Sequence, residues 1–309
     1  MRHKTLVTGS GGLLGHAVRE ICPEAFFVTS RDCDLMDPHK TLRLFRKAKP
    51  DRVIHLAAQV GGVKKNAAQN ADLLTSNVMI NTNVLNAARE CGVSRLLSVI
   101  SSCAYRVYAD RPSCEEDLHE GLPFAGNLGY GFSKRLLDIQ TRLLYEQYQC
   151  RFSTITPVTI YGPNDNWDLE DGHVVASLIH KCHLAKARNK PLEVWGSGRA
   201  VRQFVFSHDA ARVLARLLDM PSGPQTVIVA PDSGVAIREL AEAVAKAMDF
   251  AGPIVFDGSK PEGQLIRVLR SKRFSELFPD FKFTPLDEGL RKTARWFLAH
   301  EDEARGLSA

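Results

Sequence analysis

The sequence predicts an α/β protein with a doubly wound, mainly parallel sheet, followed by a smaller and less regular α/β part. The first observation is that short apolar runs alternate with longer segments of helical period from residue 4 to residue 160. Such alternation indicates repeated strand–helix units, whose strands pair in parallel. The second observation is that the alternation loosens beyond residue 163, where a second architecture is expected. A length of 309 residues allows one or two large domains.

The expected elements follow one another in chain order. Strand-like runs of the first part occupy residues 4–8, 25–30, 52–58, 95–101 and 152–158, and the helical segments between them occupy 12–21, 38–48, 72–90 and 130–148. In the second part, helical segments occupy 172–187 and 237–250, and short strands occupy 192–197 and 253–258. The apolar run 225–230 is expected to return to the main sheet. We therefore predict a dinucleotide-binding domain of residues 1–165 with a return near 200–230. A substrate-binding domain is predicted to comprise 166–200 and 231–309.

Charge, cysteines and hydropathy exclude several function classes. The 40 basic and 35 acidic residues give a net charge of +5 without a block of like charges, which disfavours a nucleic-acid partner and suits phosphate-bearing ligands. Seven cysteines without a C-x-x-C pair predict neither a disulfide framework nor a metal site, and favour the reducing cytoplasm. The N-terminus leads directly into a strand-like run, and no run of about 18 apolar residues occurs, so we expect neither an export signal nor a membrane span.

A glycine-rich segment follows the first strand-like run. Gly9, Gly12 and Gly15 form G-x-x-G-x-x-G at the point where a strand leads into a helix. Glycine there permits a tight turn and close approach of the backbone to a diphosphate, and the helix N-terminus offers unpaired N–H groups to the anion. The alternative is a glycine-rich turn without a ligand. The position at the head of a strand–helix repeat favours a Rossmann-type dinucleotide site.

The end of the second strand-like run bears on the choice of cofactor. It ends at Ser30 and Arg31 without the acidic residue that would bind a ribose 2′-hydroxyl. Arg31 is instead suited to a 2′-phosphate, which favours NADP over NAD; the alternative is that Arg31 is a solvated loop charge. Asp34 and Leu35 are placed to meet the adenine.

Tyr130 and Lys134 are candidates for proton transfer. Their i, i+4 spacing puts them on one face of the expected helix, where the lysine ammonium should lower the pKa of the phenol. Ser101 lies at the carboxyl end of the fourth strand-like run, the edge at which doubly wound sheets bind ligands. The alternative is that Tyr130 packs in the core. With the glycine loop, these residues resemble the extended short-chain dehydrogenase/reductase superfamily.

A narrower resemblance extends over nearly the whole chain, which is similar to the GDP-L-fucose synthase family. The motifs that carry it are HLAAQVGGV at 55–63, SSCAY at 101–105, GNLGYGFSKR at 126–135, YGPNDNW at 161–167, EDGHV at 170–174, LIHKCHLAK at 178–186, VWGSG at 194–198, RQFVFSHD at 202–209, KPEGQ at 260–264 and RWFL at 295–298.

The resemblance implies an NADPH-dependent enzyme that epimerises the two carbons beside the C4 ketone of a GDP-sugar and then reduces the ketone. Such chemistry needs an acid and a base on opposite faces of the ring, and the resemblance assigns these roles to Cys103 and His173. From the residue types alone, a cysteine is as readily a small buried hydrophobe, and a histidine a structural side chain.

Further residues are assigned by the resemblance. Residues expected at the cofactor are Leu13, Leu14, Leu56, Ala57, Ala58 and Pro157, in addition to the glycines, Arg31, Asp34, Leu35, Tyr130 and Lys134. Residues expected at the GDP-sugar are Asn127, Lys181, Trp195, Arg202 and Arg267. Arginines suit this role because their planar fork matches a phosphate.

Three positions depart from the family pattern. Thr159 stands where the family has asparagine, Arg106 where it has proline, and Asn164 where it has histidine. These departures leave hydride transfer unaffected but raise an alternative: a related NADPH-dependent enzyme acting on another GDP-4-keto sugar, deoxy or heptose, with altered or absent epimerase activity.

Two other classes remain as alternatives. An enzyme with tightly held NAD that recycles its hydride is disfavoured, because a dehydratase would carry an acidic pair where this chain has Ser102 and Cys103. A non-catalytic NADP-binding regulator is disfavoured by the complete set of Ser101, Tyr130 and Lys134. The segments 72–90 and 133–149 have apolar residues on more than one side, and the resemblance implies a homodimer through them; the alternative is that both faces pack within one chain.

Overall fold

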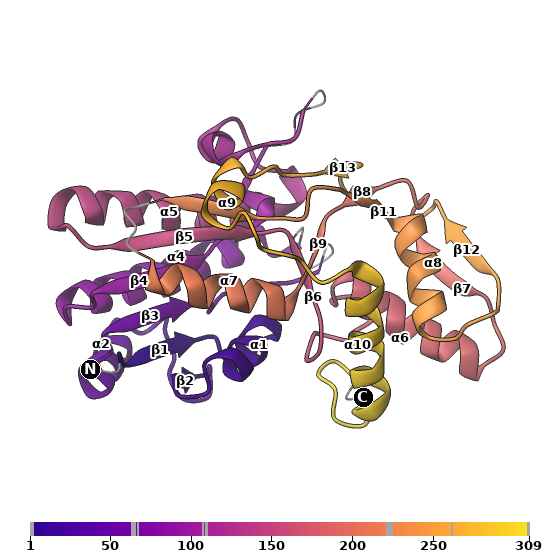
Figure 1. Ribbon diagram of the computed structural model, residues 1–309, viewed down its shortest axis with the longest axis horizontal. Coiled ribbons are helices and arrows are strands. Elements are labelled where there is room, and N and C mark those ends of the chain that lie inside the picture. Colours follow the sequence, from indigo (N-terminus) through magenta and orange to yellow (C-terminus); the bar gives the residue numbers. More distant parts are fainter. Residues whose placement is uncertain are drawn as a thin grey trace.

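A parallel six-stranded sheet forms the first lobe of the computed structural model (Figure 1), which describes residues 3–62, 66, 68–106, 108, 111–220, 225–260 and 262–307. Val63 and Pro261, which belong to two of the quoted motifs, lie outside these residues. The strands lie in the order β2–β1–β3–β4–β5–β10, and all five pairings are parallel. Their bounds are Phe26–Val28, Thr5–Thr8, Arg52–His55, Arg95–Val99, Phe152–Pro157 and Thr226–Val229. The predicted doubly wound fold is confirmed.

Helices pack on both faces of this sheet. Helices α2 (Pro38–Ala48), α4 (Asn70–Glu90) and α5 (Leu128–Tyr148) pack beside one another, and α1 (Leu13–Ile21) packs beside α7 (Ser207–Asp219). Short 3-10 helices occupy Ser102–Ala104, Glu115–His119 and Ala125–Asn127. The connection after β1 leads to β2 on one side of the sheet, whereas the connection after β3 leads to β4 on the other side. The carboxyl ends of β1 and β3 therefore form the switch point at which doubly wound sheets bind ligands.

Two helix starts show how local chemistry sets the elements. Asp37 caps α2, because its carboxylate accepts hydrogen bonds from the backbone N–H groups of His39 at 2.8 Å and Lys40 at 3.0 Å, and Pro38 occupies the first turn. Gly12 caps α1 without any side-chain hydrogen bond. The first N–H groups of α1 therefore remain available to a ligand.

The second lobe is built around α6 (Val174–Ala187), α8 (Ile237–Ala247) and α10 (Leu286–Ala299), with the parallel pair β7 (Leu192–Trp195) and β12 (Ile254–Asp257). The two short sheets elsewhere are β8 (Val201–Arg202) with β11 (Val235–Ala236) and β13 (Ile266–Arg267), and β6 (Thr159–Tyr161) with β9 (Phe204–Phe206). Figure 1 shows α6, α8 and α10 on the right, away from the main sheet. The expected smaller α/β part is thus present.

The chain passes between two hydrophobic cores several times. The first core contains Val227 of β10, and also Phe274 in α9 (Lys272–Leu277) and Phe278, which the predicted division assigns to the second domain. The second core contains Tyr161 and, after α9, Leu290. The predicted domain boundaries therefore remain a proposal. No helix in the described part is long and apolar enough to cross a bilayer.

Candidate active site

A cavity of about 1180 Å³ is lined by residues of both lobes and lies at the carboxyl ends of β1, β3, β4 and β5. All predicted site residues line it, and those roles remain predictions. They are Gly9, Gly12, Leu13, Leu14, Gly15, Arg31, Asp34, Leu35, Leu56, Ala57, Ala58, Ser101, Cys103, Asn127, Tyr130, Lys134, Pro157, His173, Lys181, Trp195, Arg202 and Arg267. The structure therefore brings together residues that the sequence separates by more than 250 positions.

The glycine loop forms a cradle at one end of the cavity. A Cβ on Gly15 would lie 2.5 Å from the Cα of Ser10, and one on Gly9, whose φ is +70°, would lie 2.5 Å from the backbone nitrogen of Ala57. A Cβ on Gly12 would meet no protein atom closer than 3.6 Å and would project into the cavity. The space next to the free N–H groups of α1 therefore fits a diphosphate.

The turn after β2 leaves Arg31 exposed at the edge of the cavity. Asp32 closes this turn by accepting hydrogen bonds from the backbone N–H of Thr29 at 2.8 Å and from its hydroxyl at 2.7 Å. The Thr29 hydroxyl holds the pKa of Asp32 below its usual value, so the carboxylate stays charged within the turn. Arg31 is thus free to meet a phosphate.

Tyr130, Lys134 and Ser101 meet where α5 crosses the end of β4. Lys134 is buried and donates from Nζ to the carbonyl oxygen of Val99 at 2.9 Å, and the Tyr130 hydroxyl is hydrogen-bonded to that of Ser101. Nζ lies 5.6 Å from the centre of the Tyr130 ring. Burial lowers the pKa of Lys134 to about 8.

The expectation that Lys134 lowers the pKa of the phenol is wrong for this structure. Burial raises the pKa of Tyr130 and the nearby Cys103 adds to this effect, while the hydrogen bond to Ser101 opposes it. Spacing alone did not reveal that both groups are desolvated. The phenol is consequently protonated at neutral pH, which is the state required of a proton donor.

The sulfur of Cys103 accepts two hydrogen bonds within the cavity. Nδ2 of Asn127 and Nη1 of Arg267 both lie 3.2 Å from Sγ. Nη2 of Arg267 also lies 3.5 Å from the hydroxyl oxygen of Thr159. Arg267, which the resemblance assigns to the GDP-sugar, therefore contacts the predicted acid/base cysteine.

His173 is paired with an aspartate that the sequence analysis did not single out. Nδ1 of His173 lies 2.8 Å from Oδ1 of the buried Asp165. The charge of Asp165 raises the pKa of His173, although burial opposes the shift. Because Nδ1 is occupied, Nε2 is the nitrogen available to a ligand. Asp165 lies in the YGPNDNW motif, eight residues before His173. That spacing is the one sequence signal that could have indicated the pair.

The second-lobe wall of the cavity is rich in cations. Nζ of Lys181 lies 4.3 Å above the ring of Trp195. Arg202 donates to the backbone carbonyls of Val201 and Gln264. Burial lowers the pKa of Arg202 to about 10, with the neighbouring Arg267 adding to the shift, so Arg202 remains charged at neutral pH. This wall suits an anionic ligand.

The three departures from the family pattern lie in different places. Thr159 lines the large cavity. Arg106 packs over the ring of Tyr108, 5.2 Å from its centre, and lines a separate cavity of about 270 Å³. Asn164 adopts a left-handed conformation with φ of 64° and is absent from the lining of the large cavity. Thr159 is therefore the departure placed to affect a ligand there.

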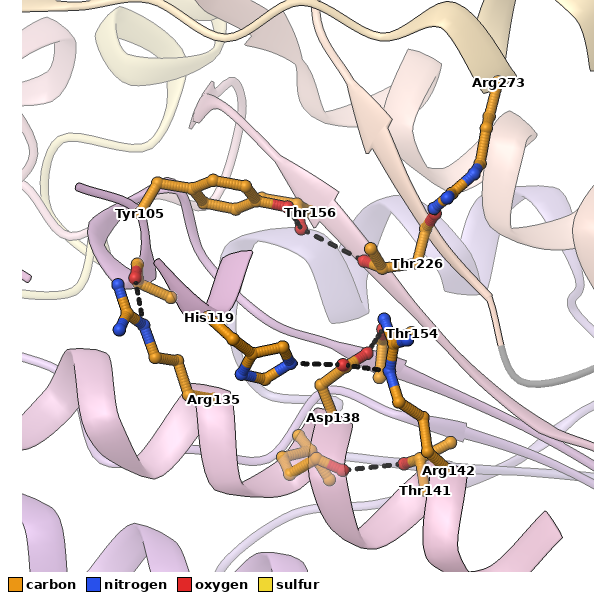
Figure 2. Close-up of polar contacts among 12 residues, drawn as sticks. Tyr105, His119, Arg135, Asp138, Thr141, Arg142, Thr154, Thr156, Thr226 and Arg273 are labelled. Atoms are coloured by element: carbon orange, nitrogen blue, oxygen red, sulfur yellow. Dashed lines mark hydrogen bonds and ion pairs between the residues drawn. The ribbon is translucent and has the colours of Figure 1, made fainter. Parts of the chain in front are cut away.

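A buried polar network behind the cavity fixes α5 against the sheet (Figure 2). Asp138, one turn beyond Lys134, accepts hydrogen bonds from Nε2 of His119 at 2.9 Å, Nε of Arg142 at 2.6 Å and the hydroxyl of Thr154 at 2.7 Å. Burial opposes ionisation, but these three donors hold the pKa of Asp138 below its usual value. The network therefore positions the helix that carries Tyr130 and Lys134.

Arg135 adds further bonds from the same helix. Its guanidinium donates to the backbone carbonyls of Ala104 at 2.7 Å, Gly121 at 2.6 Å and Glu120 at 3.0 Å. Together with the Asp138 network, it ties α5 to the segment that follows Cys103. Among the described residues, no group of three or more His, Cys, Asp or Glu side chains is arranged to hold a metal ion.

Comparisons with known proteins agree with this arrangement. Residues 5–230 match the model of the NAD dependent epimerase/dehydratase family. The GDP-L-fucose synthase of Dictyostelium discoideum is 35% identical over 98% of both chains, and that of Escherichia coli K12 is 31% identical over 99% of both. The crystal structure of a GDP-L-fucose synthetase from Naegleria fowleri bound to NADP superposes with a TM-score of 0.91 at 34% identity, covering 98% of this chain and 95% of that one. The chain therefore belongs to the GDP-L-fucose synthase family, within the NAD dependent epimerase/dehydratase family.

Proposed function

We propose that this protein converts GDP-4-keto-6-deoxy-D-mannose to GDP-L-fucose by epimerisation at C3 and C5 and NADPH-dependent reduction at C4. One observation carries the proposal: a single cavity holds a proton donor beside a serine, Tyr130 and Ser101, together with a second pair of titratable groups, Cys103 and His173. The family membership supports the same reaction.

The cofactor fits the residues present. The cradle at Gly12 would accept the diphosphate, and Arg31 would hold the 2′-phosphate that distinguishes NADP from NAD. Leu56, Ala57 and Pro157 would line the nucleotide along the strand ends, and Lys134 would orient the nicotinamide ribose. When bound, the reduced cofactor supplies a hydride.

Epimerisation requires proton removal from a carbon next to the ketone. One of Cys103 and His173 takes the proton from C3 or C5, and the electron pair moves onto the ketone oxygen, where Ser101 and Tyr130 donate hydrogen bonds to the enolate. The other residue returns a proton to the opposite face of the same carbon, so the configuration inverts and no group is lost. Arg267 and Asn127 position the sulfur, and Asp165 positions the imidazole.

Reduction then uses a different proton. As C4 is reduced, Tyr130 gives its phenolic proton to the oxygen that becomes the hydroxyl. The high pKa of Tyr130 keeps that proton in place until the oxygen acquires charge. Lys181, Trp195 and Arg202 hold the GDP portion of the substrate on the second-lobe wall.

The organisation of the molecule is proposed on the same basis. Residues 1–165, with a return near 200–230, bind the cofactor, while 166–200 and 231–309 bind the sugar nucleotide. The exposed apolar side chains Leu74 and Met79 on α4 and Ile139 and Leu143 on α5 form the interface of a homodimer. The seven free cysteines fit a cytoplasmic location.

The test is a reaction in heavy water. Purified protein, NADPH and GDP-4-keto-6-deoxymannose should oxidise the cofactor and yield GDP-fucose carrying deuterium at C3 and C5, as read by NMR. The absence of NADPH oxidation would contradict the proposal and favour another GDP-4-keto sugar. Oxidation without deuterium at these carbons would contradict the epimerase step, and Thr159 would then be the first residue to exchange for asparagine.

A further inference from the structure

The C-terminal tail is anchored to the second lobe at three consecutive residues. Ala304 is buried in the second core, and the backbone N–H of Trp167 donates to the carbonyl oxygen of Arg305 at 2.9 Å. Gly306 has a φ of +93°, and a Cβ there would lie 2.4 Å from Oδ1 of Asn166. The tail therefore packs closely against the segment that carries Asp165, the partner of His173.

This anchoring delivers the Arg305 side chain to the large cavity, whose wall it helps to form. The side chain is exposed there, and within the described residues it forms neither an ion pair nor a side-chain hydrogen bond. A guanidinium that lines a ligand cavity without a carboxylate partner is available to an anion.

The lining of the large cavity places Arg305 between the two lobes, because it also includes Gly12 and Leu13 at the start of α1 and His173 just before α6. Burial lowers the pKa of His16 in α1, and the charges of Arg19 and Arg305 add to that effect. The charge of Arg305 also acts on His173, where it partly opposes the dominant raising effect of Asp165. Arg305 thus lies near both the helix that begins at the glycine loop and the predicted acid/base histidine.

We propose that Arg305 binds the nicotinamide-side phosphate of the cofactor diphosphate, an inference that rests on the proposed use of NADPH. The helix N-terminus at Gly12 holds the diphosphate from the first lobe, and Arg305 reaches the same anion from the second. The adenine end of the cofactor belongs at Arg31, whereas the tail that carries Arg305 packs against the segment of Asp165, the partner of His173 at the reacting end. The planar fork of the guanidinium matches two phosphate oxygens.

Binding measurements on the full chain test this role. The variants are Arg305→Gln and Arg305→Lys, and Arg295→Gln on α10 is the matched control, since Arg295 is exposed and is not among the residues that line the cavity. Dissociation constants are measured for NADPH by its fluorescence, and for adenosine 2′,5′-bisphosphate and GDP by calorimetry. Adenosine 2′,5′-bisphosphate carries the adenosine-side phosphate but lacks the nicotinamide-side one.

Arg305→Gln should weaken NADPH binding about 10-fold, equivalent to about 1.4 kcal/mol. The affinities for adenosine 2′,5′-bisphosphate and GDP should change less than about twofold. Arg305→Lys should lie between wild type and Arg305→Gln, because it keeps the charge but loses the fork. Arg295→Gln should bind all three ligands as wild type does. All variants should have the melting temperature of the wild-type protein.

Several results would overturn the inference. Unchanged NADPH affinity in Arg305→Gln would do so, and so would equal losses for NADPH and adenosine 2′,5′-bisphosphate, because the effect would not then come from the missing phosphate. If wild type turns over the GDP-sugar while Arg305→Gln binds NADPH normally, only this inference fails. If Arg305→Gln loses NADPH affinity as expected while wild type turns over no GDP-sugar, only the proposed function fails. A wild-type protein that does not bind NADPH overturns both.

Discussion

Replacing two glycines of the same loop with alanine should separate cofactor binding from folding. A methyl group on Gly12 projects into the cavity, with no protein atom closer than 3.6 Å. A methyl group on Gly15 would lie 2.5 Å from the Cα of Ser10 and 2.6 Å from its carbonyl carbon and oxygen. Gly12→Ala should therefore harm the ligand site alone, and Gly15→Ala should harm the fold.

The magnitudes follow from what each methyl group meets. For Gly15→Ala, overpacking against the backbone should lower the free energy of unfolding by about 1–3 kcal/mol. The higher helix propensity of alanine offsets up to about 1 kcal/mol of this loss. Gly12 has a φ of −92°, which alanine adopts without strain, so Gly12→Ala should change the free energy of unfolding by less than about 1 kcal/mol. Keeping the diphosphate away from the N–H groups of α1 removes charge-assisted hydrogen bonds worth about 1.5–3 kcal/mol. The NADPH dissociation constant should then rise about 10- to 100-fold.

Two measurements on each variant are sufficient. Thermal melting without ligand reports stability, and fluorescence titration with NADPH reports affinity. A Gly12→Ala variant that binds NADPH as tightly as wild type would refute the placement of the diphosphate at this loop. A Gly15→Ala variant that melts at the wild-type temperature would refute the close contact between Gly15 and Ser10.

Three further changes test the site and its support. Tyr130→Phe should lower the rate of ketone reduction about 10²- to 10⁴-fold in a stopped assay of NADPH oxidation. This variant should still incorporate deuterium at C3 and C5. An equal loss of reduction and of deuterium incorporation would contradict the role of Tyr130 as the proton donor of the reduction step. His173→Gln should abolish this incorporation while NADPH affinity stays within about threefold of wild type; unimpaired incorporation would exclude His173 from epimerisation. Asp138→Asn should melt at a lower temperature at neutral pH. Because the pKa of Asp138 is lowered in the folded state, its stabilisation is present above its unfolded pKa of about 3.9 and is lost as pH falls through the lowered value. As pH decreases, the melting temperatures of wild type and Asp138→Asn should therefore converge. A difference in melting temperature that stays constant with pH would contradict the ionised state of Asp138 in its network.

The main sheet could be predicted because its signals are local. Helix α2 begins at Pro38 and ends at Ala48, the bounds expected from its helical period. The large cavity could be anticipated because loops that follow parallel strands meet at one edge of a sheet. That rule alone brings Gly9, Leu56 and Ser101 together.

The remaining features depend on contacts that the sequence does not encode locally. Strands β8, β11 and β13 have two residues each, too few for any periodicity, and they form only because distant segments meet. The position of Arg305 depends on how the C-terminal tail packs against Trp167. The raised pKa of Tyr130 depends on burial, which an i, i+4 spacing does not report.

The repeated passage of the chain between its two cores limits how the protein can be divided. The first core takes side chains from residues before Tyr161, from Val205, from Ala210 to Ala230 and again from Leu269 to Phe278. The second core takes side chains from Tyr161 to Val194, from Leu240 to Met248 and again from Leu290 to Ala304. No single cut of the polypeptide releases either lobe as a contiguous fragment. Protease nicking at an exposed loop should therefore leave the pieces associated, and truncated genes that encode one lobe should yield insoluble product.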